Sequence, residues 1–181
     1  MSSRRIIFET ERLIVRLYDW NDEETFFLLN GDEEVVRYIR PAKSREDCNL
    51  FLREVINYAE ENPLLGRWAV DEKTTGRNIG MFAIFPVEKT DKLQLGYSLL
   101  RDSWGKGYST ELTKKGIKYF FDNLQKEKLY AITETLNVAS QKVLEKCGFT
   151  LSERYVKEGK EILEYSFSKL YKSWELLSTC T

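Results

Sequence analysis

The sequence contains no histidine, and this absence restricts the chemistry that the chain can perform. Histidine is the commonest general base near neutral pH and the commonest zinc ligand, so any catalytic mechanism must rely on other side chains. Cysteine is also scarce, and Cys48, Cys147 and Cys180 have neither the spacing of a metal site nor that of a disulfide framework. We therefore expect no bound metal and a reducing, cytoplasmic location.

Long apolar segments and a large excess of one charge are missing as well. The longest apolar run, residues 81–85, is far too short to span a bilayer, and the first five residues lack the apolar core of a signal peptide. The formal net charge is -1, so no overall positive field attracts nucleic acid. The sequence thus predicts neither a membrane protein nor a nucleic-acid-binding protein.

What the sequence does have is enough apolar material for a core. Its 181 residues are 42% hydrophobic and 13% aromatic, a composition typical of a folded domain rather than of a disordered chain. No internal repeat, low-complexity tract or linker divides it. We expect a single domain over residues 1–181, with its core between residues 8 and 167.

Hydrophobic periodicity predicts a mixed α/β fold of the α+β class. Alternating or unbroken apolar runs indicate strands at residues 6–17, 67–71, 78–87, 93–100 and 129–135, and a hairpin formed by 154–156 and 162–167. Helical spacing and capping residues indicate helices that end at Asn30, cover 32–39, lie between Ser44 and Pro63, or cover 110–124 and 139–146. This order implies a central mixed, mostly antiparallel sheet flanked by helices on both faces, and residues 171–181 resemble a loosely held tail.

Residues 104–110 join a predicted strand to a predicted helix and have the features of an anion site. Gly105 and Gly107 allow the backbone to take positive φ or to approach a ligand closely, and the first amides of a helix lack intrahelical acceptors. These features predict a cradle for a phosphate or pyrophosphate. An ordinary strand-to-helix turn capped by Ser109 or Thr110 explains the same residues equally well from local physics.

Three sequence blocks resemble those of the GNAT superfamily of acyl-CoA N-acyltransferases, and in particular its RimJ/RimL-like branch. Residues 8–16 form the first block, residues 104–109 lie over the family motif Q/R-x-x-G-x-G/A, and residues 137–149 form the third. Trp104 replaces the usual Gln or Arg of the motif, and Ser109 stands where Gly or Ala is usual. The resemblance runs over nearly the whole chain and implies the GNAT fold, in which the thioester arm of acetyl-CoA lies between two splayed parallel strands.

The resemblance also implies an acetyl-CoA site and no metal. The strand before the turn is expected to bind the pantetheine arm through its backbone, the turn amides the pyrophosphate, and the second helix of the motif the nucleotide end. A solvated helix face is an equally good explanation for the lysine on that second helix. The residues assigned to the cofactor in this way are Leu99, Leu100, Trp104, Gly105, Lys106, Gly107, Tyr108, Ser109, Thr110, Asn137, Ser140 and Lys142.

Candidate catalytic residues follow from the same resemblance. It gives Ser140 a hydrogen bond to the departing thiolate and Asn137 a contact with cofactor or substrate, although helix capping explains both residues as well. The tyrosine that many GNAT enzymes use to protonate the thiolate is replaced here by Leu144, and the usual glutamate base by Gln94. Glu134 is then the candidate for a base that acts through water, and a plain surface role is the alternative.

The expected substrate is a primary amine. At pH 7 a lysine-like amine must give up about 4.6 kcal/mol to become neutral, and an α-amino group only about 1 kcal/mol, so a site without a strong base suits a protein or peptide N-terminus best. Tyr38 and Trp68 are expected to line the acceptor pocket and Tyr97 to bind substrate or relay a proton, with core packing as the alternative for each. A polyamine or antibiotic amine acetyltransferase and a non-catalytic CoA-binding module remain open, as does the choice between monomer and homodimer.

Overall fold

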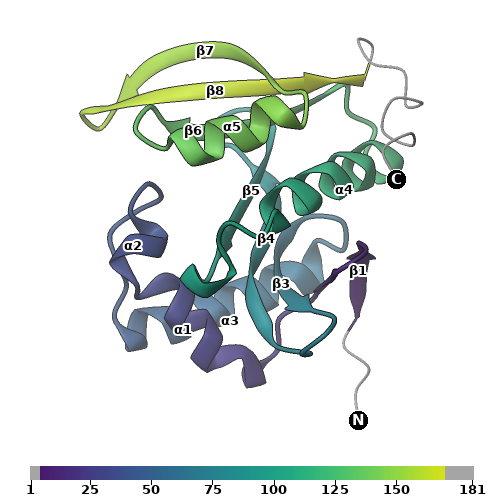
Figure 1. Cartoon of the computed structure of the whole chain (residues 1–181), viewed down its shortest axis with the longest axis vertical. Helices are drawn as coiled ribbons and strands as arrows, with labels where there is room; N and C mark the ends of the chain where they lie inside the picture. The colour runs from purple at the N-terminus through teal and green to yellow at the C-terminus, as the bar shows by residue number, and fades with distance from the viewer. Residues whose placement is uncertain (1–4, 170–181) are drawn as a thin grey trace.

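The computed structural model of the protein describes residues 5–169 and shows a sheet of eight strands with helices on both faces. The strands lie in the order β1-β2-β3-β4-β5-β6-β8-β7, and every neighbouring pair is antiparallel except β5 and β6 (Figure 1). The strand bounds are β1 (Ile6–Glu9), β2 (Leu13–Arg16), β3 (Gly66–Glu72), β4 (Asn78–Pro86), β5 (Leu93–Leu99), β6 (Lys128–Glu134), β7 (Thr150–Lys157) and β8 (Lys160–Ser168). The fold class predicted from the sequence is confirmed.

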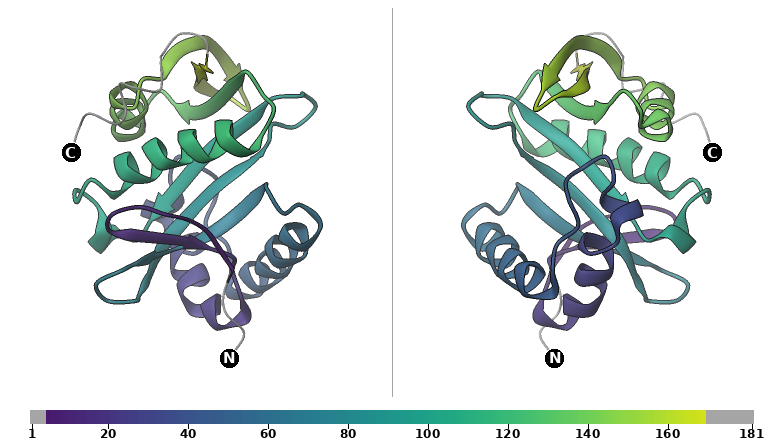
Figure 2. Two further views of the ribbon diagram at one scale, coloured as in Figure 1. Left: turned by 90° about the vertical axis from the view of Figure 1, so that its right-hand side faces the viewer. Right: turned by 90° about the vertical axis from the view of Figure 1, so that its left-hand side faces the viewer.

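The helices divide the core into two clusters of buried side chains. One cluster lies between the sheet and the pair α4 and α5 and includes Phe82, Leu112 and Leu144; the other lies under α1 and α3 and includes Phe26 and Leu52 (Figure 2). The helix bounds are α1 (Glu23–Asn30), α2 (Glu33–Val36), α3 (Arg45–Glu61), α4 (Tyr108–Asn123) and α5 (Val138–Lys146), with short 3-10 helices at η1 (Trp20–Asp22) and η2 (Arg101–Ser103). Within residues 5–169, none of the helices has the length and apolar character needed to cross a membrane.

Most of these elements agree with the sequence predictions within two residues, but the first predicted strand is wrong. Residues 6–17 form two short antiparallel strands, β1 and β2, instead of one. The chain reverses at Thr10, whose N–H donates to the Leu13 carbonyl at 2.9 Å while its Oγ1 accepts from the Leu13 N–H at 2.9 Å. The helix predicted at 32–39 is also shorter, since α2 ends at Val36; the predicted tail at 171–181 lies outside the described residues.

The parallel pair β5 and β6 is the irregular point of the sheet. Only Gln94 and Tyr130 are in register, so the two strands diverge beyond that pair. On its other side β5 is tied to β4 along its length, and the Leu100 N–H donates to the Ile79 carbonyl at 2.9 Å. In an antiparallel ladder this phase turns the backbone groups of Tyr97 and Leu99 away from β4, toward the space between β5 and β6. The predicted splay is thus present.

A β-bulge in β4 lies beside this divergence. Val70 pairs with Gly80, but Asp71 pairs with Asn78, so the residue between them is extra. The Asn78 side chain closes the bulge, because its Oδ1 accepts from the Gly80 N–H at 3.1 Å. A Cβ atom on Gly80 would lie 2.5 Å from the Ser98 carbonyl oxygen, so only glycine lets β4 approach β5 this closely.

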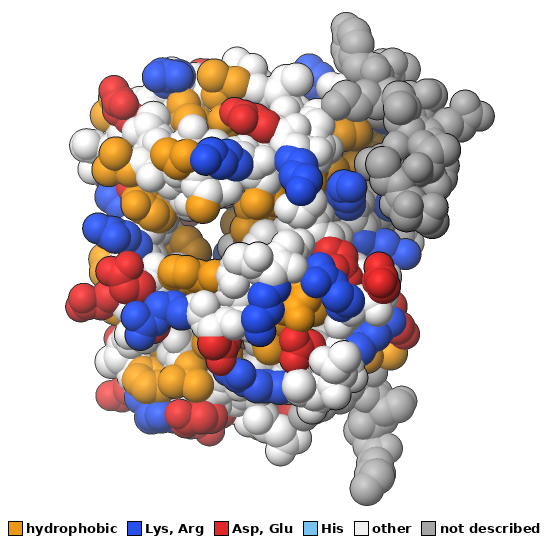
Figure 3. Space-filling model, viewed as in Figure 1, with side chains coloured by type: hydrophobic (Ala, Val, Ile, Leu, Met, Phe, Trp, Pro, Cys, Tyr) orange, Lys and Arg blue, Asp and Glu red, His pale blue; other side chains and the backbone are white. Residues whose placement is uncertain are grey.

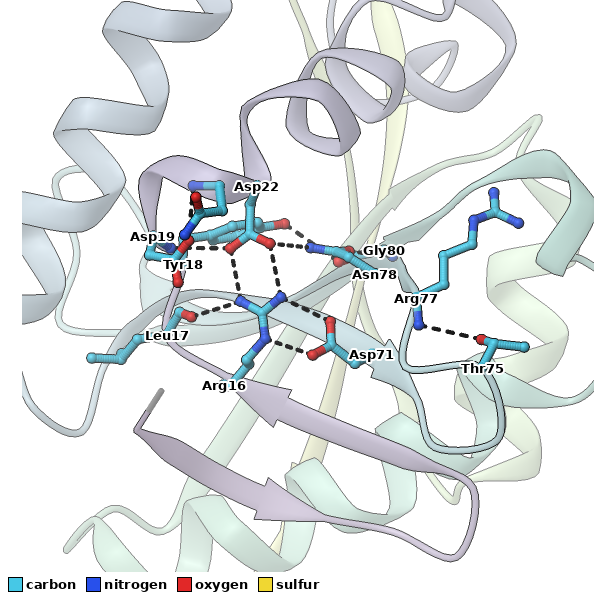
Figure 4. Close-up of polar contacts among 11 residues, drawn as sticks. Arg16, Leu17, Tyr18, Asp19, Asp22, Asp71, Thr75, Arg77, Asn78 and Gly80 are labelled. Carbon is cyan, nitrogen blue, oxygen red and sulfur yellow. Dashed lines mark hydrogen bonds and ion pairs between the residues drawn. The ribbon is translucent and has the colours of Figure 1, made fainter. Parts of the chain in front are cut away.

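A buried ion cluster holds the bulge in place (Figure 4). Arg16, only 3% exposed, contacts Asp22 at 2.7 Å and Asp71 at 2.6 Å, and the Asn78 Nδ2 donates to Asp22 Oδ1 at 3.3 Å. Burial raises the pKa of Asp22, but hydrogen bonds from Arg16 and from the Asp19 N–H outweigh it, and the pKa lies below its usual value. Burial and the nearby Asp22 carboxylate raise the pKa of Tyr18, whose hydroxyl donates to the Gly80 carbonyl at 3.3 Å. The cluster therefore ties η1, β2, β3 and β4 together.

We expect Asp22→Ala to lower the free energy of unfolding at pH 7 by about 3–5 kcal/mol, because it leaves Arg16 buried with one carboxylate fewer. Since the pKa of Asp22 is lower in the folded state, its contribution is complete above about pH 4 and is lost as the pH falls through the folded-state pKa. The difference between wild type and variant should therefore shrink in acid. Urea unfolding at pH 7 and at about pH 3 measures both effects.

The matched control is Glu34→Ala, which removes an exposed ion pair with Arg37 on α2. Such a pair contributes about 0–1 kcal/mol. Equal destabilisation by the two variants would contradict the structural role of the buried cluster.

Candidate active site

The turn before α4 has open backbone amides, as an anion cradle requires. Gly105 and Gly107 have φ values of 74° and 82°, and Gly107 is the N-cap of α4 without any side-chain cap. Ser109 and Thr110 lie inside the helix, so the alternative in which one of them caps it is wrong. In the described part of the chain, no hydrogen-bond acceptor meets the N–H groups of residues 105–110. These groups and the positive end of the helix can bind an anion.

An ion pair from the start of β2 fixes this turn. The Arg12 guanidinium contacts Glu111, in the first turn of α4, at 2.6 Å, and its Nη1 donates to the Lys106 carbonyl at 3.0 Å. Glu111 Oε1 also accepts from the Thr10 hydroxyl at 2.5 Å and from the Arg12 N–H at 2.9 Å. Burial raises the pKa of Glu111, but these hydrogen bonds outweigh it and leave the pKa below its usual value. The turn is therefore set before any ligand arrives.

Tyr108 anchors the turn from its other side. Its ring is buried and lies 4.6 Å from the Arg12 guanidinium, and its hydroxyl donates to Glu72 Oε1 at 2.5 Å. Lys106 is exposed at the tip of the turn, with its Nζ 6.0 Å from the same ring. The Tyr108 side chain thus belongs to the scaffold, and only its backbone N–H is available to a ligand.

The backbone groups expected to bind the pantetheine arm need one correction. The Leu100 N–H donates to Ile79, and its carbonyl accepts from the Ser103 N–H at 2.9 Å, so the protein itself uses both groups. The expected role of Leu100 is therefore wrong. Leu99 faces the space between β5 and β6 as expected, with its carbonyl accepting from the Trp104 indole at 2.7 Å. The phase of the ladder turns the backbone of Tyr97 toward the same space as that of Leu99, a place expected for Leu100.

A pair of hydroxyl groups crosses from β5 to α5. Tyr97 Oη lies 3.3 Å from Ser140 Oγ, and the Ser140 N–H donates to Asn137 Oδ1 at 3.1 Å. Asn137 is thus the N-cap of α5, as its local spacing predicted. Burial raises the pKa of Tyr97 to about 12, although the hydrogen bond with Ser140 lowers it, so the phenol stays protonated at neutral pH. Leu144, which takes the place of the usual GNAT tyrosine, is 2% exposed in the core.

The other residues that the sequence predicted for the site have varied surroundings. Glu134 forms an ion pair with Lys160 at 2.5 Å, so its carboxylate already has a cationic partner. Lys142 is exposed on α5, and Tyr38 is half-buried after α2. Trp68 is 1% exposed and packs in the core, with its ring 6.2 Å from that of Phe82. Its expected place in the acceptor pocket is therefore corrected to a packing role.

Arg12 belongs to the site, although its role was not predicted from the sequence. Its partner Glu111 lies 99 positions further along the chain, and no local pattern connects the two. Figure 3 shows a hollow on one face of the molecule, between α5 and α2. The open turn, the diverging strands and the hydroxyl pair all belong to elements around the parallel pair β5 and β6.

A family model described as an acetyltransferase (GNAT) domain matches residues 12–150. The chain belongs to the GNAT family. It is an acyltransferase that acts on amines, as the sequence predicted. An uncharacterized protein of Bacillus subtilis, YkkB, is 30% identical over 162 residues, which are 86% of this chain and 92% of that protein.

Solved structures of other GNAT proteins share the fold. The ribosomal-protein-S5-alanine acetyltransferase of Vibrio fischeri has a TM-score of 0.74 at 20% identity, over 92% of this chain and 98% of that one. A spermidine N-acetyltransferase of Vibrio cholerae, in complex with CoA and spermine, has a TM-score of 0.74 at 18% identity, over 88% and 96% of the two chains. At this identity the likeness shows the fold alone. The two proteins are named for different acceptors.

We expect Glu111→Gln to lower the free energy of unfolding by about 1.5–3 kcal/mol, because it replaces charge-assisted hydrogen bonds by neutral ones. It should also raise amide hydrogen exchange at Glu111 itself, whose N–H donates to the Gly107 carbonyl at 3.1 Å and closes the turn that Arg12 holds. Glu46→Gln is the control. Glu46 is exposed in the first turn of α3, so it shares with Glu111 only the interaction with the helix dipole. Unchanged exchange in the turn would show that Arg12 and Glu111 do not brace it.

Proposed function

We propose that the protein transfers the acetyl group of acetyl-CoA to the α-amine of a peptide or protein N-terminus, by direct attack of the amine. The observation that carries this proposal is the set of unbonded N–H groups over residues 105–110, at the head of a helix that borders two diverging strands. Such a turn suits a diphosphate, and the divergence suits an extended thioester arm. That the protein is an acetyltransferase acting on amines follows from its family.

The residues present fit acetyl-CoA. A Cβ atom on Gly105 would meet no atom within 4 Å, so the turn is open on the side where its side chain would lie. The Tyr97 backbone and the Leu99 N–H lie beside the turn, whereas the Leu99 carbonyl accepts from the Trp104 indole. Exposed Lys106 and Lys142 add positive charge toward the phosphates. When bound, acetyl-CoA supplies a thioester, which is activated toward attack by a neutral amine.

The hydroxyl pair supplies the proton that the reaction requires. Acetyl transfer forms a C–N bond and breaks the C–S bond, which leaves a thiolate that must be protonated. Tyr97 carries a proton at Oη at neutral pH, as any phenol does, and Ser140 Oγ stands 3.3 Å away to return a proton from solvent. The first amides of α5 add positive potential where the thiolate forms. Tyr97 thus takes the role that Leu144 cannot perform.

The proposed α-amine acceptor follows from the weak provision for a base. Gln94 cannot accept a proton at useful pH, and Glu134 is held in an ion pair with Lys160. An α-amino group needs only about 1 kcal/mol to be neutral at pH 7, against about 4.6 kcal/mol for an alkylamine. Water is then a sufficient acceptor for the ammonium proton. A polyamine, the ligand of the Vibrio cholerae neighbour, is the second candidate acceptor.

Calorimetry with CoA tests the cofactor assignment. We expect Gly105→Ala to weaken CoA binding by about 10-fold or more, because the strained residue displaces the amides that hold the diphosphate. Gly159→Ala is a close control, since Gly159 has a φ of 76°, against 74° at Gly105, and open space around it in the β7–β8 turn. Both variants should lose about 1–2 kcal/mol of stability. Equal CoA affinity in the two would refute the assignment of the turn.

Thiol release with acetyl-CoA and a peptide tests the hydroxyl pair. We expect Tyr97→Phe to lower kcat by about 10²–10⁴-fold while the Kd for CoA stays unchanged, because a general acid contributes in that range. Tyr155→Phe, on the β7 hairpin, should leave kcat as in wild type. Full activity of Tyr97→Phe would remove Tyr97 from the mechanism, and CoA binding without turnover on any amine would favour the non-catalytic module.

A further inference from the structure

Three basic side chains gather around one aromatic ring on the sheet face that α1 and α3 cover. The Arg40 guanidinium and the Lys43 Nζ each lie 5.4 Å from the centre of the Phe51 ring, and the Arg67 guanidinium lies 5.5 Å from it. Arg67 also lies 4.3 Å from the ring of Phe85. All five side chains are half-buried, so each keeps part of its surface exposed. We call Arg40, Lys43 and Arg67 the basic cluster.

In the described part of the chain, no carboxylate forms an ion pair with the basic cluster, whereas many surface cations have such a partner. Arg40 Nη2 donates to Asn30 Oδ1, but its Nε is buried without any hydrogen-bond partner. Burial and the neighbouring Arg67 lower the pKa of Arg40, and burial lowers the pKa of Arg67 despite attraction from Tyr58 and Glu54.

Such an arrangement is costly unless an anion completes it. Unpaired guanidinium groups lose hydration on burial, and two like charges repel each other. Each guanidinium carries N–H donors in the planar fork that a carboxylate accepts, and the Arg40 Nε is without a partner. The basic cluster therefore has the chemistry of a carboxylate site.

The basic cluster lies on the same face of the sheet as part of β5. Arg67 is opposite Ala83 in β4, and Ala83 is opposite Gly96 in β5, so the three positions share one face. Two strand spacings separate Arg67 from Gly96, which is about 10 Å. Gly96 directly precedes Tyr97, and the place of its missing Cβ is 3.6 Å from the Phe85 ring. The segment around α2, which leads to Arg40, passes in front of these strands (Figure 2, right).

We propose that Arg40 and Arg67 bind a carboxylate of the amine substrate, with Lys43 as a third cation. The substrate is then an α-amine whose own chain carries a carboxylate within about 10 Å of the nitrogen. This inference rests on the proposed function, because it assigns a recognition group to the same acceptor site. It also favours a peptide over a polyamine, whose cationic nitrogens the basic cluster repels.

Matched peptides test the proposal on the whole protein. One short peptide has aspartate at its second position and its partner has asparagine there, and each is made with a free and with an amidated C-terminus. We expect kcat/KM to favour aspartate by about 10- to 100-fold, the range of a hydrogen-bonded charge pair. A preference that follows the free C-terminus instead assigns the cluster to the terminal carboxylate, and either preference supports the proposal. Equal rates on all four peptides, or faster turnover of spermidine, would overturn it.

Variants separate recognition from structure. Arg67→Gln and Arg40→Gln should each bring the preference for the acidic peptide close to 1, because they lower kcat/KM on the acidic peptide far more than on the neutral one. Arg67→Lys should restore part of the preference, and Arg53→Gln, an exposed arginine on α3, should change neither. Equal losses on both peptides would show a merely structural role. The Kd for CoA is measured first in every variant: no CoA affinity in wild type would refute the proposed function as well, whereas normal affinity without acid preference would refute this inference alone.

Discussion

The candidate active site depends on the fact that β5 and β6 share a single residue pair. Each strand is fully used on its other edge, since β5 pairs with β4 and β6 pairs with β8 along their lengths. The connection between them is α4, which begins at the turn after β5. The divergence, the free backbone edge of β5 and the head of α4 therefore arise at one place. Because the strands are parallel, both also run toward the same side, where α5 follows β6.

Two charged groups of the N-terminal segment hold the two sides of this opening. Arg16, at the end of β2, is buried with Asp22 and Asp71, and this cluster stabilises the bulge in β4. Arg12, just before β2, is partly exposed and supports the turn before α4. The first is a closed network, in which every donor of the guanidinium has an acceptor, and the second leaves the amides of the turn free. The two networks differ because Arg16 is buried, where every donor must be paired, whereas Arg12 is partly exposed beside amides that a ligand can reach.

Local chemistry made much of this predictable from the sequence. The glycine turn, the Asn137 cap and the order of strands and helices depend on spacings of a few residues. The split of residues 6–17 into two strands was missed, because apolar alternation continues through the reversal at Thr10. The backbone of Leu100 was predicted to face the cofactor instead of that of Tyr97, for a different reason. The direction of these backbone groups depends on the hydrogen-bonding phase of β5 against β4, in which the Leu100 N–H donates to the Ile79 carbonyl, and no local sequence pattern reveals the phase between two strands.

The basic cluster offers a physical reason why the proposed acetyl transfer needs no strong base. Positive charge near an amine favours its neutral form, and the unpaired cations Arg40, Lys43 and Arg67 outnumber a single bound carboxylate. Gln94, which faces the same side of the sheet, adds no negative charge that would oppose this effect. A glutamate there would stabilise the ammonium ion as well as accept its proton. For the proposed α-amine substrate, the loss of the usual base and the presence of the cluster therefore act in the same direction, because both favour the neutral amine that attacks the thioester.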